Sequence, residues 1–138
     1  MAKLYDVVSK ILEIALEQPS VKSAMEGSVY QLNETKTQIY GAFVATQGQH
    51  TLEDGFIRYN FTFFYVDRLT ASGDNRLLVQ STGVDTLSNI ILRLENEDFG
   101  MEGNATINTF TERFESECAG AYATLNILLP VDDCYETY

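Results

Sequence analysis

The sequence has little of what catalytic and nucleic-acid-binding sites usually need. Its 138 residues include one histidine, His50, no tryptophan, and nine Lys and Arg against twenty Asp and Glu, which gives a net charge of -11. A single histidine excludes metal sites and proton-transfer mechanisms that require two or more histidines. The absence of a basic run argues against tight binding to phosphates, because that binding needs clustered Lys and Arg.

The chain also lacks a long apolar run at its start. The opening stretch, MAKLYDVVSKILEIALEQ, carries a charge every few residues. It therefore has neither the uninterrupted apolar core of a signal peptide nor a membrane span. We expect a chain that is made in the cytoplasm and has no membrane contact. In that compartment Cys118 and Cys134 are expected to be reduced thiols, although the sequence leaves their redox state open.

Other short patterns that can carry chemistry are incomplete. The adjacent carboxylates at Glu53 and Asp54 are expected to point to opposite sides of an extended chain and not to converge as an acid-base pair. Gly100 and Gly103 lack the Lys-Ser/Thr that completes a phosphate-binding loop. His50 lies in a polar segment and is interpreted as an exposed loop histidine. The sequence therefore predicts no enzyme activity, no cofactor and no metal site.

What the chain does contain is typical of one globular domain spanning residues 1–138. Hydrophobic residues make up 45% of the sequence, with eight Tyr and eight Phe. A chain of this length buries roughly two thirds of the surface that its unfolded form exposes. No internal repeat, linker or low-complexity tract divides it.

The first element is predicted to be a helix from Ala2 to Gln18, ended by Pro19. Its polar residues recur at spacings of three and four and cover about a quarter of its circumference. Its apolar residues cover roughly 200°, which is wider than one sheet contact usually needs. We therefore expect this helix to be buried from two directions.

The remaining pattern predicts strands on both sides of a second helix. A short helical turn is expected at Ser20 to Glu26, and the polar segment 48–55 should join two antiparallel strands. Asp74 can cap the second helix. Its apolar face is expected to contain Leu77, Gln80, Val84, Leu87, Ile91 and Leu94. The expected strands are 28–32, 38–47, 56–69, 105–114 and 118–131. This order predicts an α+β domain: an N-terminal helix and a mainly antiparallel sheet with a second helix packed on it.

One strand departs from simple alternation. In RYNFTFFYVDRLT, Tyr59, Phe61, Phe63 and Tyr65 share one face, as in a half-buried strand. Phe64 and Val66 then place apolar bulk on the other face. Something must cover that second face at one end of the strand. The cover is expected to be a helix, with the second helix as one alternative, or a neighbouring subunit.

The stretches YVDRL, QSTGVDTLSNII and FTERFESECAGAYATLNI resemble bacteriophage tail-terminator and neck proteins, which form head-to-tail connector rings. The sequence of these stretches is most similar to the versions in crAss-like phages, and the resemblance spans nearly the whole chain. It implies a tail-terminator-like α+β subunit in a closed ring of 12 or 6 copies between the portal and the tail. It also implies contacts with neighbouring portal, neck and tail proteins, a location in the virion, and DNA that passes through without specific binding.

The ring interpretation assigns two sets of candidate residues. Heterologous contacts are expected at the sheet edges and at the loops Gln47 to Gly55 and Asn96 to Asn104. The candidate interface residues are Tyr5, Leu12, Leu16, Phe64, Val66 and His50. An acidic channel would repel DNA phosphates and let the duplex slide. The candidate lining residues are Glu53, Asp54, Glu95, Glu97, Asp98 and Glu102.

A different function class is also compatible with the pattern. A curved antiparallel sheet wrapped by helices can form a cone-shaped fold, with Tyr and Phe lining a pocket for a small molecule. Such a binding module would be a monomer or a dimer. An enzyme built on the same cone is less well supported, because converging polar groups are not evident in the sequence.

Overall fold

A computed structural model describes residues 3–28, 41–70, 74–97, 99–101, 105–113 and 117–131, and the side chains of all of these except 112, 113 and 117. In this part of the chain, two helices and seven strands form an α+β fold with a mostly antiparallel sheet, which confirms the predicted fold class. The elements are α1 (Lys3–Leu16), β1 (Ser23–Glu26), β2 (Ala42–Gln47), β3 (Thr51–Glu53), β4 (Phe56–Arg68), α2 (Arg76–Glu95), β5 (Gly100–Met101), β6 (Thr106–Arg113) and β7 (Glu117–Pro130).

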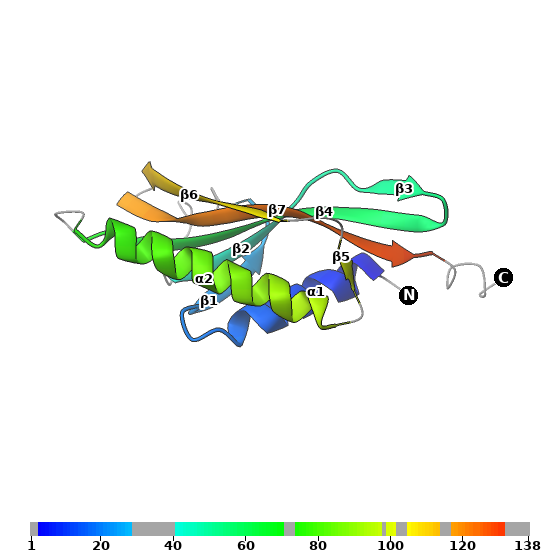
Figure 1. The fold of residues 1–138 in the computed structure, drawn as a ribbon, viewed down its shortest axis with the longest axis horizontal. Helices are drawn as coiled ribbons and strands as arrows, with labels where there is room; N and C mark the ends of the chain where they lie inside the picture. Colours follow the sequence, from blue (N-terminus) through cyan, green and yellow to red (C-terminus); the bar gives the residue numbers. More distant parts are fainter. Residues whose placement is uncertain are drawn as a thin grey trace.

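The two longest strands, β4 and β7, form the centre of the sheet. They pair antiparallel along the whole of β4, from Phe56 opposite Pro130 to Arg68 opposite Cys118. The other edge of β4 is shared by β2 and β3, and the other edge of β7 by β6 and β5. β1 pairs with β2 in parallel at the far edge. The result is an elongated sheet from which the β3–β4 hairpin extends at one end (Figure 1).

Both helices lie on the same face of this sheet (Figure 1). The spacing of Val7, Ile11, Ile14 and Ala15 turns these side chains to one side of α1, where they are buried. They meet the side chains that β2, β4 and β7 direct to the same face, including the fully buried Phe43, Phe61, Phe63, Ala123 and Ile127. None of the described helices is long and apolar enough to cross a membrane.

A close approach between α2 and the sheet depends on Gly83. A methyl group at this position would lie 3.1 Å from Cβ of Ala121 and 3.2 Å from Cδ2 of Tyr65. Glycine is unfavourable inside a helix, but here its missing side chain lets the helix backbone lie directly on the sheet. The small residues Ala121 and Ala123 on β7 belong to the same core.

The second face of β4 has a small core of its own. Val66 is fully buried there in a cluster with Ala42, Val44 and Cys118. Phe64 is half-buried, with its ring centroid 6.4 Å from that of Phe110 and 5.9 Å from that of Tyr122. The break in alternation therefore marks a cluster on the face opposite the helices. The alternative in which α2 covers this face is wrong, because α2 packs on the other one.

Several local predictions also differ from the structure. Ser20 to Glu26 was expected to be a helical turn, but its second half is β1, which pairs with β2. The expected hairpin loop contains β3, which pairs with β4. α2 begins after Asn75 rather than after Asp74, and no side chain caps it. Asn75 instead holds the end of β4, because its Nδ2 donates to the Arg68 carbonyl at 3.2 Å.

The first helix packs against both the sheet and α2, as expected, but part of its apolar surface stays exposed. Leu4, Val8 and Leu12 are half-buried against the core, but Tyr5 and Leu16 are exposed. The apolar surface of α1 is therefore covered by the sheet and by α2, and its outer border faces solvent in the single chain. Residues 29–32 of the predicted strand 28–32 and the residues after Val131, Cys134 included, lie outside the described residues.

Candidate assembly surfaces

The described residues contain no group of three or more His, Cys, Asp or Glu side chains placed to hold a metal ion. Every buried side-chain nitrogen or oxygen in this part of the chain has a hydrogen-bond partner. Buried polar groups that lack a partner often mark a ligand site. The described polar groups are therefore accounted for by the fold itself.

His50 supports the base of the β3–β4 hairpin. Its Nδ1 accepts a hydrogen bond from the Asn60 backbone N–H at 3.2 Å, and its Nε2 lies 3.0 Å from Oε1 of Gln47. Because Nδ1 is an acceptor here, the proton of the neutral ring is on Nε2 and is donated to Gln47. The ring also packs edge-on against Tyr59, with centroids 5.3 Å apart. The expected exposed loop histidine is instead half-buried and bonded through both nitrogens.

An ion-pair network joins the two helices near the end of α2. Glu97 lies 2.7 Å from Arg93 and 3.3 Å from Lys10, and Arg93 lies 3.5 Å from Glu17. The hydrogen bond from Arg93, followed by the one from Lys10, lowers the pKa of the Glu97 carboxyl. Glu97 therefore faces two cations of its own chain, and most of its charge is compensated locally.

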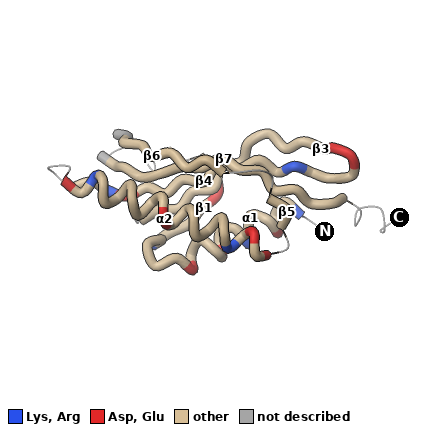
Figure 2. Tube along the Cα trace, in the orientation of Figure 1, with Lys and Arg blue, Asp and Glu red and all other residues tan. Residues whose placement is uncertain are grey.

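The four described candidate acidic residues, Glu53, Asp54, Glu95 and Glu97, lie toward one end of the molecule. The β3–β4 turn and the end of α2 are both on this side, since β5 and the start of β4 flank the same part of β7 (Figure 2). Glu53 pairs with Arg58 on the neighbouring strand. Asp54 and Glu95 are exposed, and no described cation pairs with either. Asp98 and Glu102 lie outside the described residues.

The candidate interface residues do not form one surface. Tyr5, Leu12 and Leu16 follow one side of α1, where Leu12 is half-buried and the other two are exposed. Phe64 is half-buried on the opposite face of the sheet. Val66 is fully buried in the single chain, so its side chain is not available to a second subunit. Its burial reflects the small core beside β2 and β7.

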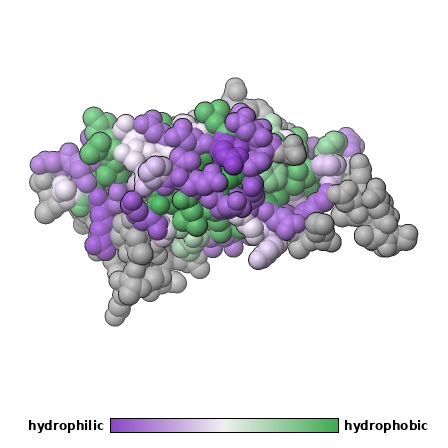
Figure 3. Space-filling model, turned by 90° about the horizontal axis from the view of Figure 1, so that it is seen from below, coloured by the Kyte–Doolittle hydropathy of each residue, from purple (hydrophilic) through white to green (hydrophobic). Residues whose placement is uncertain are grey.

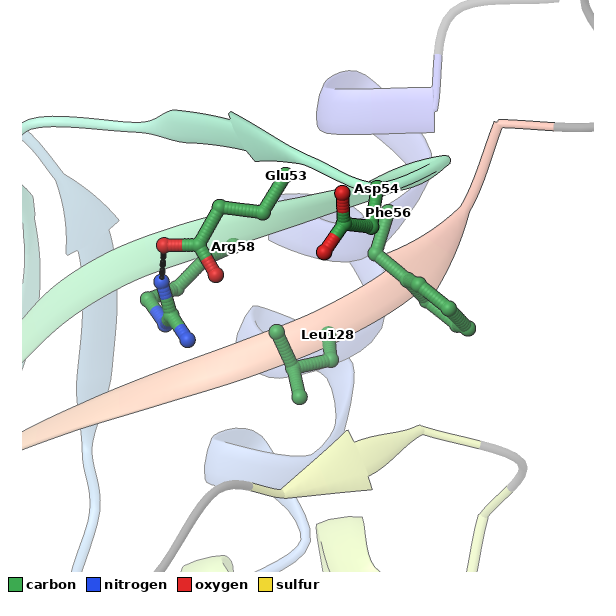
Figure 4. Close-up of a pocket in the computed structure, with 5 residues that line it drawn as sticks. All are labelled: Glu53, Asp54, Phe56, Arg58 and Leu128. Atoms are coloured by element: carbon green, nitrogen blue, oxygen red, sulfur yellow. Dashed lines mark hydrogen bonds and ion pairs between the residues drawn. The ribbon is translucent and has the colours of Figure 1, made fainter.

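A shallow pocket of about 270 Å³ lies beside the hairpin turn. Glu53, Asp54, Phe56 and Arg58 contribute from the hairpin, and Leu128 contributes from β7 (Figure 4). The Glu53–Arg58 ion pair borders one side of this pocket (Figure 4). Asp54 has a positive φ of 43° in the tight turn and carries its carboxylate at the surface. The pocket thus combines an apolar floor with charged groups at its rim.

The sequence reasoning missed a set of exposed apolar side chains. Leu77 and Leu78 at the start of α2 are 71% and 69% exposed, and Leu52 on β3 is 70% exposed. Leu92 on α2 and Phe56 on β4 are also exposed. On the helix side of the molecule, hydrophobic residues reach the surface in several separate areas among hydrophilic ones (Figure 3). The adjacency of Leu77 and Leu78 was the available signal, since neighbours on a helix diverge by about 100° and rarely both face one core.

No protein-family model matches this sequence, and no curated protein sequence matches it either.

Proposed function

We propose that this chain is a structural virion protein that forms a closed ring in the neck or tail of a phage, between the portal and the tail. DNA passes through the ring without specific binding. The ring contains 12 or 6 copies and contacts neighbouring portal, neck and tail proteins. Its subunits are present in the host cytoplasm before they are incorporated. The resemblance in the YVDRL and FTERFESECAGAYATLNI stretches motivates this assignment.

The observation that carries the proposal is the exposure of large apolar side chains at separate places on one small subunit. Leu77 and Leu78 lie at the start of α2, Leu52 and Phe56 lie in the hairpin, and Tyr5 and Leu16 lie on α1. Exposed apolar groups in several places fit a subunit with several neighbours. A ring embedded between two other layers gives each subunit such neighbours.

The small-molecule-binding alternative receives less support from the core. In a cone-shaped binding fold, aromatic residues of the sheet line a cavity beneath the helices. Here Phe43, Phe61 and Phe63 are fully buried by the packing of the helices against the sheet. The pocket beside the hairpin is instead shallow and has charged residues at its rim. It resembles a contact surface more than an enclosed ligand site.

The acidic channel belongs to the same proposal. With a net charge of -11 per copy, a ring of many copies concentrates negative charge around its axis. Among the described candidates, Asp54 and Glu95 are the two carboxylates without a described cation partner. These two carry the least compensated charge and would repel phosphates most strongly.

The proposal is tested by finding the chain in assembled particles. Phage particles from cells that carry this gene would be purified, checked for the chain by mass spectrometry, and imaged by cryo-electron microscopy. We expect a ring of identical subunits between the portal and the tail. Particles that lack the chain, or that carry it as isolated copies away from the neck and tail, would contradict the proposal.

A further inference from the structure

The two ends of the subunit carry different exposed surfaces. One end holds Arg76, Leu77 and Leu78, here called the helix patch. The other end holds the pocket of Glu53, Asp54, Phe56, Arg58 and Leu128, here called the hairpin pocket. Strand β4 connects them, since it starts at Phe56 and the carbonyl of its last residue, Arg68, accepts a hydrogen bond from Asn75 just before α2. A strand of this length separates the two surfaces by about 40 Å.

Resting on the proposed ring, we infer that the helix patch of one copy docks into the hairpin pocket of the next copy. Each subunit then uses its two ends on two different neighbours. Contacts between two unlike surfaces of one chain are heterologous, and they close into a ring when the rotation between successive copies is a simple fraction of a full turn. The ring is then built through the helix patch and the hairpin pocket.

The apolar parts of the two surfaces are complementary in form. Leu77 and Leu78 are neighbours in the first turn of α2, and both side chains are exposed. The hairpin pocket is concave, and Phe56 and Leu128 provide its apolar lining. Its volume of about 270 Å³ accommodates an aliphatic side chain. Docking removes a leucine of the helix patch and the pocket lining from water together.

The charged groups are complementary as well. Arg76 is the first residue of α2, where the helix dipole disfavours a cation. Its Nη1 donates to Oε1 of Gln80 at 3.1 Å, and no described carboxylate pairs with it. In the hairpin pocket, Glu53 already pairs with Arg58, whereas Asp54 has no described cation partner. One uncompensated guanidinium thus meets one uncompensated carboxylate.

The acidic residues near the helix patch do not neutralise Arg76. Asp67 is occupied by its neighbour, since its Oδ1 accepts a hydrogen bond from the Arg68 backbone N–H at 2.8 Å. Asp74 is exposed just before α2 and forms no ion pair with Arg76. A two-fold dimer through either surface would place Arg76 near Arg76, or Asp54 near Asp54. Like charges at the contact disfavour that arrangement and favour the head-to-tail one.

Cysteine cross-linking tests the contact in the purified full-length chain. A Phe56→Cys, Leu78→Cys double variant, made with Cys134→Ser, places one thiol in the hairpin pocket and one in the helix patch, since both residues are exposed. Under mild oxidation we expect a ladder of disulfide-linked dimers, trimers and higher species on a non-reducing gel. The matched control is Phe56→Cys with Leu92→Cys, because Leu92 is also an exposed leucine of α2 but lies outside the helix patch. The inference is overturned if the double variant gives no ladder, or if both pairs give equal ladders.

A charge exchange tests the ionic part of the contact. Asp54→Arg alone and Arg76→Glu alone should each lower the yield of the ladder about fivefold. The combination of both substitutions should restore the yield, because the pair is re-formed with exchanged signs. Failure of the combination to exceed either single variant would overturn the assigned pairing. Circular dichroism of each variant checks that the surface changes leave the fold intact.

The outcomes separate this contact from the proposed function. A ladder from the purified chain together with its absence from phage particles keeps the contact and rejects the ring in the phage neck. A ring in particles whose subunits meet through other surfaces keeps the proposed function and rejects the contact. If the contact holds, Asp54 lies between subunits, and Glu95 is left as the described candidate for the channel lining.

Discussion

At the scale of single residues, the alternation along β4 places side chains that stabilise the fold on one face and charged surface side chains such as Arg58 on the other. Phe61 is fully buried among the aromatic side chains of the core. Phe61→Ala should therefore lower the free energy of unfolding by about 3 to 5 kcal/mol. Arg58 lies on the other face and pairs with Glu53, so Arg58→Ala should cost about 1 kcal/mol or less. Thermal melts of the two variants measure the difference, and the reverse ranking would contradict the register of this strand.

Tyr65 makes the stability depend on pH at the alkaline end. Burial, with a smaller contribution from the nearby Asp67 carboxylate, raises the pKa of Tyr65 to about 12. The folded state therefore holds the phenol proton more tightly than the unfolded state, where the pKa is about 10. This contribution to stability is complete below pH 10 and is lost as the pH rises toward 12.

The corresponding experiment compares the chain with Tyr65→Phe. We expect denaturant midpoints of the unmodified chain to fall between pH 10 and pH 12 more steeply than those of the variant. The variant also lacks the hydroxyl that donates to the Ser20 carbonyl at 3.3 Å, so its midpoint at neutral pH is the reference for each curve. Parallel curves for the two proteins would show that another group causes the alkaline loss.

At the scale of elements, the close packing of α2 on the sheet predicts that a glycine-to-alanine substitution lowers stability, which is the opposite of what helix propensity alone predicts. Replacing glycine by alanine inside a helix usually stabilises it by about 1 kcal/mol. At Gly83 the added methyl group would meet Ala121 and Tyr65 at 3.1 and 3.2 Å, so Gly83→Ala should destabilise the domain by about 1 to 3 kcal/mol. Ser81→Ala, on the exposed side of the same helix, is the control and should change stability little. A more stable Gly83→Ala variant would mean that the helix can move away from the sheet.

The elements with strong periodic patterns could be predicted from the sequence. The polar stripe of α1, the alternation in β4 and the long apolar run of β7 each indicated the right element. The short strands could not be predicted, because their pairing is not local. Ser23–Glu26 is a strand only because β2 offers it a parallel edge, and Thr51–Glu53 only because the hairpin folds back on β4. The start of α2 was misplaced because Asn75 bonds to Arg68, a contact that the local sequence does not specify.

The candidate surfaces were harder to predict from the sequence than the fold. Tyr5 and Leu16 could be selected because the apolar surface of α1 is wider than one contact needs. Val66 could not be distinguished from a surface residue, since its burial depends on Ala42, Val44 and Cys118 from two other strands. Leu77 was assigned to the buried face of α2, although Val79 and Gly83 occupy that face instead. A rotation of the helix by part of a turn changes which residues are exposed, and the sheet determines that rotation.

At the scale of the whole molecule, the proposed channel gives a measurable consequence for DNA transport. Glu95→Lys would place positive charges near the DNA path in every copy and add attraction to phosphates. We expect slower DNA ejection from phage particles, with a delay that shrinks as salt rises, because screening acts over roughly 8 Å at physiological ionic strength. Asp85→Lys makes the same charge change at an exposed position nearer the middle of α2 and is the matched control. Equal delays in both variants, or no delay in either, would contradict a lining role for Glu95.

The pairing of β4 with β7 also has a consequence for how the chain is made. β4 is a central strand, but its long partner is the last element of the described chain and follows it by about fifty residues. During synthesis, Phe61 and Phe63 cannot be buried in the complete sheet until β7 has left the ribosome. Pairings between distant segments slow folding and leave strand edges open in the meantime. A nascent chain stopped before β7 should therefore be a chaperone substrate, and completed subunits should become competent for assembly only after release.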